Sequence, residues 1–200
     1  MVQGSGLKNH VWGFDSLPRH QFEMIYSSQL KTINKIQKQQ FQDKFISNQL
    51  ITDGLGKKID PGIIEAVTFL NLLEIPTTQS CEGHLPPIIG DSYPWIEIST
   101  PEINKWDDIG QIEKILKPRN LKSQKAMLIL LDEFYINRNP PAHVRLTFRF
   151  IGIYGDFRIQ SLGGMAMEIN PLKENRILHQ NYRDEMAAFT EFLKTKILGK

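Results

Sequence analysis

Residues 142–160 read AHVRLTFRFIGIYGDFRIQ, and this stretch predicts a β-hairpin. Its first half alternates with period two, which in a strand turns successive side chains to opposite faces. The apolar face would carry Val144, Leu146, Phe148 and Phe150, and the polar face Arg145, Thr147 and Arg149. The sequence Tyr-Gly-Asp-Phe at 154–157 suits a hairpin turn into a second strand at 158–160. We therefore expect two antiparallel strands in this part of the chain.

Two further strands are expected earlier in the chain, one following Pro76 and one following Pro94, because Thr, Trp and Ile favour strands. Helices are expected from apolar residues at helical spacing. The expected ranges are 16–44, 60–75, 107–117, 123–136 and 174–197. The first would have Ser16 as its N-cap and Pro18 in its first turn, and the second would have Asp60 as its N-cap, followed by Pro61. Strands that come in pairs indicate an α/β chain of the α+β type, with a mixed or antiparallel sheet packed with helices.

Length and composition fit one ordinary domain. The chain has 200 residues, of which 40% are hydrophobic and 23% charged, so it can bury a core without disulfides. We expect an N-terminal arm and helix over residues 1–45 and an α/β domain over 46–200, together one compact unit. The formal net charge of +2 neither requires nor excludes a nucleic-acid partner.

Cys81 is the single cysteine, so the fold does not depend on an oxidising compartment. The first twenty residues lack the apolar core of a signal peptide, and no apolar stretch is long enough to span a membrane. The expected location is therefore the cytoplasm, with no membrane partner.

Chemically reactive residues concentrate in Ser80-Cys81-Glu82-Gly83-His84, where a predicted strand runs into a loop. Loops at strand ends commonly carry binding and catalytic residues. Gly83 can adopt positive φ, which would expose backbone N–H groups in a concave nest that binds anions. We therefore place the candidate site in this segment.

Three functional interpretations and a structural one remain open for this segment. Cys81 could be a nucleophile whose thiolate is stabilised by His84. The same two side chains could chelate a metal, but four-coordinate zinc needs further ligands, and the other histidines and the carboxylates are too scattered to nominate, so no metal site is expected. Ser80 and the backbone could instead hold a cofactor or phosphate. Alternatively, Cys81 is a small buried hydrophobe and His84 caps a backbone group.

A second candidate patch is the polar face of the hairpin, formed by Arg145, Arg149 and Arg158. If Arg158 lies on the paired strand, the three guanidinium groups could bind phosphate or carboxylate. A solvated outer face of the sheet is the alternative. Aromatic residues are not interleaved on this face, so sequence-specific nucleic-acid recognition is unsupported.

The region from Asp60 to Ile96 resembles the tRNA wybutosine-synthesis methyltransferase family that acts after the tricyclic base is built. That family has a helix with an Asp near its start and an Asn near its end, then a Thr-rich strand and Ser-Ser-Cys-Ser-Gly-Arg. Here Asp60 and Asn71 match by position, Ser80, Cys81 and Gly83 match by identity, His84 stands in place of the arginine, and Gln79 and Glu82 stand in place of serines. The resemblance implies an α/β fold that binds S-adenosylmethionine and a tRNA purine. The missing arginine and the carboxylate of Glu82 depart from the pattern expected for a phosphate-bearing substrate.

The first hypothesis is therefore an enzyme or enzyme-derived domain that binds a small anionic or nucleotide-like ligand and has a methyltransferase-like activity. Ligand contacts would come from Thr78, Ser80, Gly83, Arg145, Arg149 and Arg158, and the reacting groups would be Cys81, Glu82 and His84. The alternatives are a cysteine-dependent hydrolase or transferase that uses Cys81 and His84, and a non-catalytic protein-interaction module whose first and last helices contact partners.

Overall fold

The computed structural model describes the backbone of residues 19–52, 56–85, 91–100, 109–168 and 172–199. The chain divides into two compact units, 1–36 and 37–200, and the boundary falls within the first helix, α1 (Arg19–Leu50). The second unit contains the sheet and both hydrophobic clusters and is described below by itself. None of the described helices is both long and apolar enough to cross a membrane.

The described part of the second unit is a mixed α+β fold with a four-stranded antiparallel sheet. Its strands are β1 (Thr77–Cys81), β2 (Trp95–Ile98), β3 (Leu146–Phe150) and β4 (Phe157–Ser161), in the order β1-β2-β4-β3. The remaining elements are α2 (Ile64–Leu72), α3 (Ile109–Tyr135), a 3-10 helix η1 (Gly164–Glu168) and α4 (Leu172–Leu198). The β3–β4 hairpin, the antiparallel sheet and the α+β class confirm the sequence prediction.

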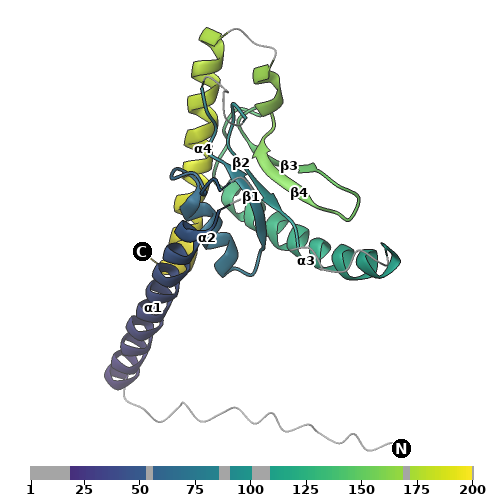
Figure 1. Cartoon of the computed structure of the whole chain (residues 1–200). Helices are drawn as coiled ribbons and strands as arrows, with labels where there is room; N and C mark the ends of the chain where they lie inside the picture. The colour runs from purple at the N-terminus through teal and green to yellow at the C-terminus, as the bar shows by residue number, and fades with distance from the viewer. Residues whose placement is uncertain (1–18, 53–55, 86–90, 101–108, 169–171, 200) are drawn as a thin grey trace, which may run out of the picture. The chain divides into compact units, whose positions relative to one another are not determined.

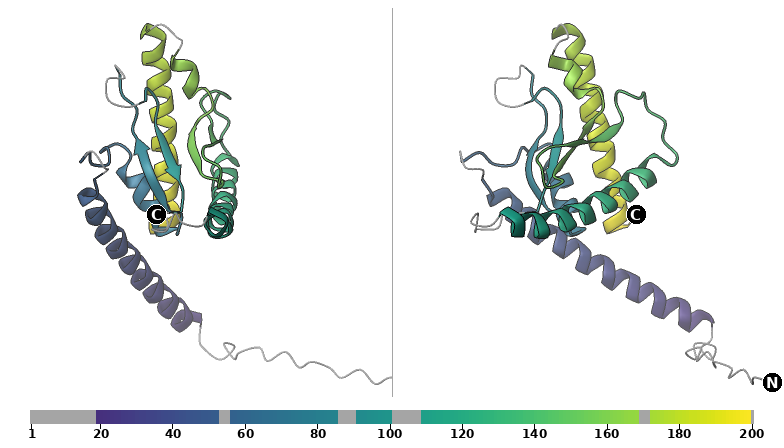
Figure 2. Two further views of the ribbon diagram at one scale, coloured as in Figure 1. Left: turned by 45° about the vertical axis from the view of Figure 1, so that its right-hand side comes forward. Right: turned by 90° about the vertical axis from the view of Figure 1, so that its right-hand side faces the viewer.

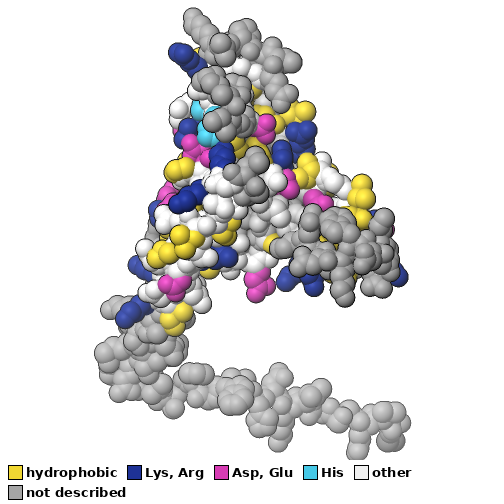
Figure 3. Space-filling model, in the orientation of Figure 1, with side chains coloured by type: hydrophobic (Ala, Val, Ile, Leu, Met, Phe, Trp, Pro, Cys, Tyr) yellow, Lys and Arg dark blue, Asp and Glu magenta, His cyan; other side chains and the backbone are white. Residues whose placement is uncertain are grey.

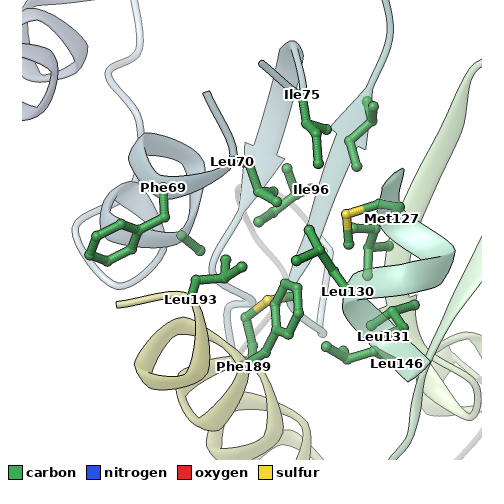
Figure 4. Close-up of a cluster of buried hydrophobic side chains, with 14 of the residues drawn as sticks. Phe69, Leu70, Ile75, Ile96, Met127, Leu130, Leu131, Leu146, Phe189 and Leu193 are labelled. Carbon is green, nitrogen blue, oxygen red and sulfur yellow. The ribbon is translucent and has the colours of Figure 1, made fainter. Parts of the chain in front are cut away.

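Helices α2, α3 and α4 supply the main core against one face of the sheet. Figures 1 and 2 show α2 and α4 beside β1 and β2, and α3 beside the β3–β4 hairpin. Ile96 and Ile98 point from β2 into this core, and Phe157 and Ile159 point into it from β4. Figure 4 shows how side chains from three helices and two strands meet there: Phe69, Leu70, Ile96, Met127, Leu130, Leu131, Leu146, Phe189 and Leu193.

A smaller cluster closes the end of the sheet where β1 stops and β2 starts. It consists of Cys81, Tyr93, Trp95, Val144, Met167 and Tyr182, with Leu85 and Leu178 packed against it. These residues come from loops, strands, η1 and α4, so the cluster holds the loop after β1 against the C-terminal half of the chain. The expected site therefore lies at the edge of a well-packed region.

Several predicted helix ends differ from the structure. Helix α1 continues to Leu50 rather than stopping near Lys44, and the expected cap at Ser16 and Pro18 lies outside the described residues. Helix α1 thus continues through residue 45, where the N-terminal arm and helix were expected to end. The expected division into residues 1–45 and 46–200 stays a prediction. Helix α2 begins at Ile64, after a turn over 61–63, so Asp60 is not its N-cap.

The two helices expected over 107–117 and 123–136 form one continuous helix, α3, with Pro118 inside it. A proline removes one backbone donor from a helix interior, which disfavours a continuous helix at this position. The helix continues because Leu116 and Met127 are buried on either side of the proline, and Asn120 is held by hydrogen bonds to the sheet region. Tertiary contacts thus offset the local cost of the proline.

Apolar patterning overestimated burial at two positions. Phe150 ends β3 and is exposed, and Ile177, an apolar residue of the helix expected over 174–197, is 65% exposed. The apolar residues of α4 that are most deeply buried are Tyr182, Met186, Phe189 and Leu193. The helix is packed at this point, because Asn175 is buried and donates to the carbonyl of Met167 and Leu178 packs against the smaller cluster, so Ile177 lies on the solvent-facing side of α4.

Candidate functional site

The predicted segment forms a bend at the end of β1, facing the turn that precedes α2. Strand β1 ends at Cys81, and the three residues after it turn back toward Asp60. We call the group formed by Asp60, Cys81, Glu82, Gly83 and His84 the strand-end cluster. It joins two chain segments that the sequence separates by about twenty residues.

Asp60 is the central acceptor of the strand-end cluster. Its Oδ2 accepts the backbone N–H of Glu82 at 3.1 Å and lies 3.1 Å from Nε2 of His84. Its Oδ1 lies 3.4 Å from Nζ of Lys57. Burial by itself raises the pKa of Asp60, but the Glu82 N–H, His84 and Lys57 together outweigh burial and lower it. Asp60 therefore carries its negative charge at neutral pH and fixes the position of the bend.

The backbone N–H groups of the bend are used within the protein. Glu82 donates to Asp60, Gly83 donates to Sγ of Cys81 at 3.4 Å, and His84 donates to the carbonyl of Asp91 at 2.9 Å. An anion nest requires N–H groups that point at the ligand. The expected nest at Gly83 is thus already satisfied by protein atoms, and a ligand at this site has to be held by side chains.

Cys81 is buried, with 3% of its surface exposed, and it packs in the smaller cluster. Burial raises the pKa of its thiol, and the negative charge of Asp60 acts in the same direction. The Gly83 N–H opposes this effect without reversing it. A nucleophilic cysteine needs a stabilised thiolate, so this environment works against the cysteine-dependent alternative.

Glu82 points toward α2 and α4. Its Oε2 accepts the backbone N–H of Gly62 at 2.6 Å. A Cβ at Gly62 would lie 2.5 Å from this oxygen and 3.3 Å from Nη2 of Arg183, so the carboxylate and the guanidinium group share the space that glycine leaves. The Glu82 carboxylate is thus bonded to the Gly62 N–H, and the Arg183 guanidinium group lies close to the same glycine.

A second polar group continues from the strand-end cluster across the sheet. Arg158 stacks on the Trp95 ring, with its guanidinium carbon 3.7 Å from the ring centroid, and its Nε lies 3.2 Å from Oε2 of Glu97. Its Nη1 lies 3.7 Å from the carboxylate of Asp91, whose carbonyl holds His84. Thr78 donates to Glu97 at 3.1 Å. Two predicted ligand-binding residues, Thr78 and Arg158, are thereby connected to the candidate site.

The other predicted ligand-binding residues lie in different surroundings. Arg149 is the direct cross-strand partner of Arg158, as the sequence hypothesis required. Arg145 precedes β3 and stacks on the Tyr135 ring of α3, 4.4 Å from its centroid. Ser80 pairs with Ile96, whose side chain points into the core, so Ser80 lies on the opposite face of β1 from Cys81. The structure thus brings Arg149 and Arg158 together, whereas Arg145 has a different contact.

Lys57 and Arg183 were not predicted from the sequence, and Asp60 was predicted only as a helix cap and as a match to the family pattern. The spacing of Lys57 and Asp60, three residues apart, was a signal that could have paired them. No local pattern connects Arg183 with Glu82, because the two residues come together only when α4 packs beside α2. Among the side chains that Figure 3 colours by type, acidic and basic groups are interspersed on the visible face.

These observations define the class of protein as an α+β domain with a polar bend at the end of β1, in which the backbone N–H groups of 82–84 are hydrogen-bonded within the protein. Comparison with protein-family models, curated proteins and solved structures gave no match. The resemblance to the tRNA wybutosine-synthesis methyltransferases therefore stays a prediction. Within the described residues, the bend offers no unused backbone donors for S-adenosylmethionine, and the carboxylates of Asp60 and Glu82 are already paired, so we derive no step through this molecule.

Proposed function

We propose that the domain binds a small anionic or nucleotide-like ligand at the strand-end cluster and is an enzyme or derives from one. The observation that carries this proposal is the pairing of a buried carboxylate with two partly exposed nitrogen groups. Asp60 holds His84, whose side chain is 29% exposed, and Lys57, whose side chain is 41% exposed. Both can reach an external ligand while Asp60 keeps them in place.

The charges around the cluster are compatible with an anionic group. Lys57 and Arg183 lie beside the carboxylates of Asp60 and Glu82 respectively, so the site does not present unopposed negative charge. Because the backbone donors are used internally, His84 and Lys57 would make the direct ligand contacts. Arg158 would support the site indirectly through Asp91, whose carbonyl fixes His84. Methyl transfer is the specific reaction that the family resemblance implies, and tRNA would be its substrate.

The test is isothermal titration calorimetry of the full chain with adenosine monophosphate, inorganic phosphate and S-adenosylmethionine, each in metal-free buffer. We expect one binding site for a phosphate-bearing probe. Lys57→Ala should weaken binding roughly tenfold, the value of one hydrogen bond to a charged group. Lys58→Ala is the matched control, because it removes the same charge one residue away and should leave the affinity unchanged.

Absence of heat with all three probes, together with unchanged hydrogen exchange at 80–84, would remove the ligand-binding proposal. Binding of phosphate-bearing probes without S-adenosylmethionine would retain the site and remove methyl transfer. The protein-interaction alternative predicts that Lys57→Ala and Lys58→Ala behave alike toward every small probe. The cysteine-dependent alternative predicts rapid alkylation of native Cys81, which its burial opposes.

A further inference from the structure

Three metal-ligating side chains converge in the strand-end cluster. A carboxylate oxygen of Asp60, Sγ of Cys81 and a ring nitrogen of His84 all lie within 4.8 Å of one another. The sequence offered only Cys81 and His84 as neighbouring ligands, and the fold brings in Asp60 as the third. We propose that Asp60, Cys81 and His84 bind one divalent transition-metal ion of the zinc type.

Distances within the cluster agree with those around a tetrahedral ion. With metal–nitrogen and metal–oxygen bonds of about 2.0–2.1 Å and a metal–sulfur bond of about 2.3 Å, neighbouring ligand atoms lie about 3.3–3.6 Å apart. Nε2 of His84 and Oδ2 of Asp60 are 3.1 Å apart, close to one edge of such a tetrahedron. The remaining separations, up to 4.8 Å, require shifts on the order of 1 Å, which side-chain rotation can supply.

The surroundings orient the three ligands. The Gly83 N–H points at Sγ of Cys81, and the Glu82 N–H holds Oδ2 of Asp60. Hydrogen bonds of this kind position metal ligands and stabilise a bound thiolate. The competing cation is Lys57, 3.4 Å from Oδ1 of Asp60, and its partly exposed side chain can turn toward water when the ion enters. Zinc has borderline softness and is bound in proteins by thiolate, imidazole and carboxylate groups, which are the three ligand types present here.

Charge and protons balance on binding. Asp60 is already a carboxylate, His84 binds as the neutral imidazole, and Cys81 releases its thiol proton to water. The hydrogen bond between His84 and Asp60 is replaced by one bond from each to the ion. The resulting site combines a doubly charged cation with two anionic ligands and one neutral ligand.

Three protein ligands leave a fourth position, which is the arrangement of zinc sites that bind a water molecule or a substrate oxygen. A phosphate or carboxylate group of the proposed ligand could occupy that position. This assignment of the fourth position rests on the proposed function, whereas binding of the ion itself does not. The open position would give such a group a direct bond to the ion, whereas the backbone N–H groups of 82–84 are already used within the protein.

Cobalt titration of the full, untagged, reduced chain tests the ion site without any organic ligand. We expect uptake of one cobalt ion per chain, with a thiolate-to-cobalt charge-transfer band in the near ultraviolet. Zinc should then displace cobalt and abolish the band. Because the protein has one cysteine, the band can arise only from Cys81.

Variants assign the ligands one at a time. Cys81→Ser should abolish the band, and Asp60→Asn and His84→Gln should each weaken cobalt binding at least about tenfold, since even outer-shell changes cost ten- to a hundredfold. His143→Ala is the matched control for incidental histidine binding and should leave both band and affinity unchanged. Circular dichroism verifies folding of each variant, and His84→Gln remains informative if Cys81→Ser does not fold.

Failure to take up one equivalent of cobalt, or uptake without the charge-transfer band, would overturn the metal proposal. Loss of binding in His143→Ala with full binding in His84→Gln would do the same. These outcomes are distinguishable from failure of the proposed function. Cobalt uptake with no heat from the phosphate-bearing probes would keep the ion site and remove ligand binding, and the reverse result would keep only ligand binding.

Discussion

Gly83 shows how one residue fixes the bend of the candidate site. Its φ is 82°, in the left-handed region where a side chain is strained. An added Cβ would lie 2.9 Å from the carbonyl carbon of Tyr93 and 3.0 Å from the nitrogen of Pro94. Both contacts are with backbone, which cannot move aside as a flexible side chain can. Glycine is therefore required for conformation and for close packing at the same position.

Gly83→Ala is expected to destabilise the domain by roughly 3 kcal/mol, because left-handed strain of about 1–2 kcal/mol adds to a backbone clash. Gly56→Ala is the matched control, since Gly56 has a φ of 77° but no heavy atom within 4 Å of the added Cβ. Gly56→Ala should be destabilised only by the left-handed strain, about 1–2 kcal/mol. Urea unfolding of both variants measures the difference, and equal losses would show that the contact with Tyr93 and Pro94 costs nothing.

Tyr182 illustrates burial of an ionisable side chain at the same end of the fold. Burial raises its pKa above the ordinary value of 10.0. The pKa of Tyr135 is raised as well, by burial and by its hydrogen bond to Glu185. Above pH 10 the unfolded chain releases tyrosine protons that the folded chain keeps. Stability provided by the neutral tyrosines is thus fully present below pH 10 and is lost as pH rises through the folded pKa.

Tyr182→Phe is expected to change the free energy of unfolding at pH 7 by no more than about 1 kcal/mol, since one hydroxyl is lost. Above pH 10 the free energy of unfolding of the variant should fall less steeply with pH than that of the original chain. The two slopes should differ by up to about 1.4 kcal/mol per pH unit. Urea unfolding between pH 7 and pH 11 measures both slopes. Parallel slopes would contradict burial as the cause of the raised pKa.

At the scale of elements, a buried hydrogen-bond network connects α3 to the sheet. Oδ1 of Asn120 accepts the backbone N–H of Thr100 at 2.8 Å and its hydroxyl at 2.9 Å. Nδ2 of Asn120 donates to Asp156 at 2.7 Å and to the carbonyl of Tyr154 at 3.1 Å. One amide thus joins the end of β2, the β3–β4 turn and the helix that contains Pro118.

Asn120→Ala is expected to cost about 2–4 kcal/mol, because it leaves several buried polar groups without their partner. Gln124→Ala is the comparison on the same helix. Gln124 makes one hydrogen bond, to the carbonyl of Gly155 at 2.7 Å, and its loss should cost about 1 kcal/mol. Thermal and urea unfolding give both values. Equal small losses would show that the network does not stabilise the position of α3.

At the scale of the whole molecule, the main and smaller hydrophobic clusters both lie within residues 37–200. Helices α2, α3 and α4 and all four strands also belong to that range. A cooperative folding unit needs its own hydrophobic core. The second compact unit meets this requirement by itself.

A truncated chain of residues 37–200 should therefore unfold in one cooperative transition, with a midpoint within a few degrees of that of the full chain. Differential scanning calorimetry measures the midpoint, and cobalt titration of the same chain tests whether the strand-end cluster is preserved. A midpoint more than about 10 °C lower would show that residues 1–36 contribute to the core.

The sequence by itself determined the elements whose signals are local. Alternation along 144–150 predicted β3, the turn at 154–157 predicted the hairpin, and apolar spacing predicted the helices, since these depend on neighbours a few residues apart. The position of the candidate site at Cys81 and His84 was also local, because five polar and flexible residues lie together in the chain.

Only the tertiary structure decided how those residues are used. In the folded protein, Asp60 accepts a hydrogen bond from the strand-end bend instead of capping α2, and Arg183 and Glu82 both lie close to Gly62. The backbone N–H of Gly83, which the sequence suggested could bind an anion, donates to Cys81. The tertiary structure also carried α3 through Pro118. The physical reason is that each outcome depends on contacts between segments far apart in sequence, whose energies of several kcal/mol exceed the local preferences that a sequence pattern records.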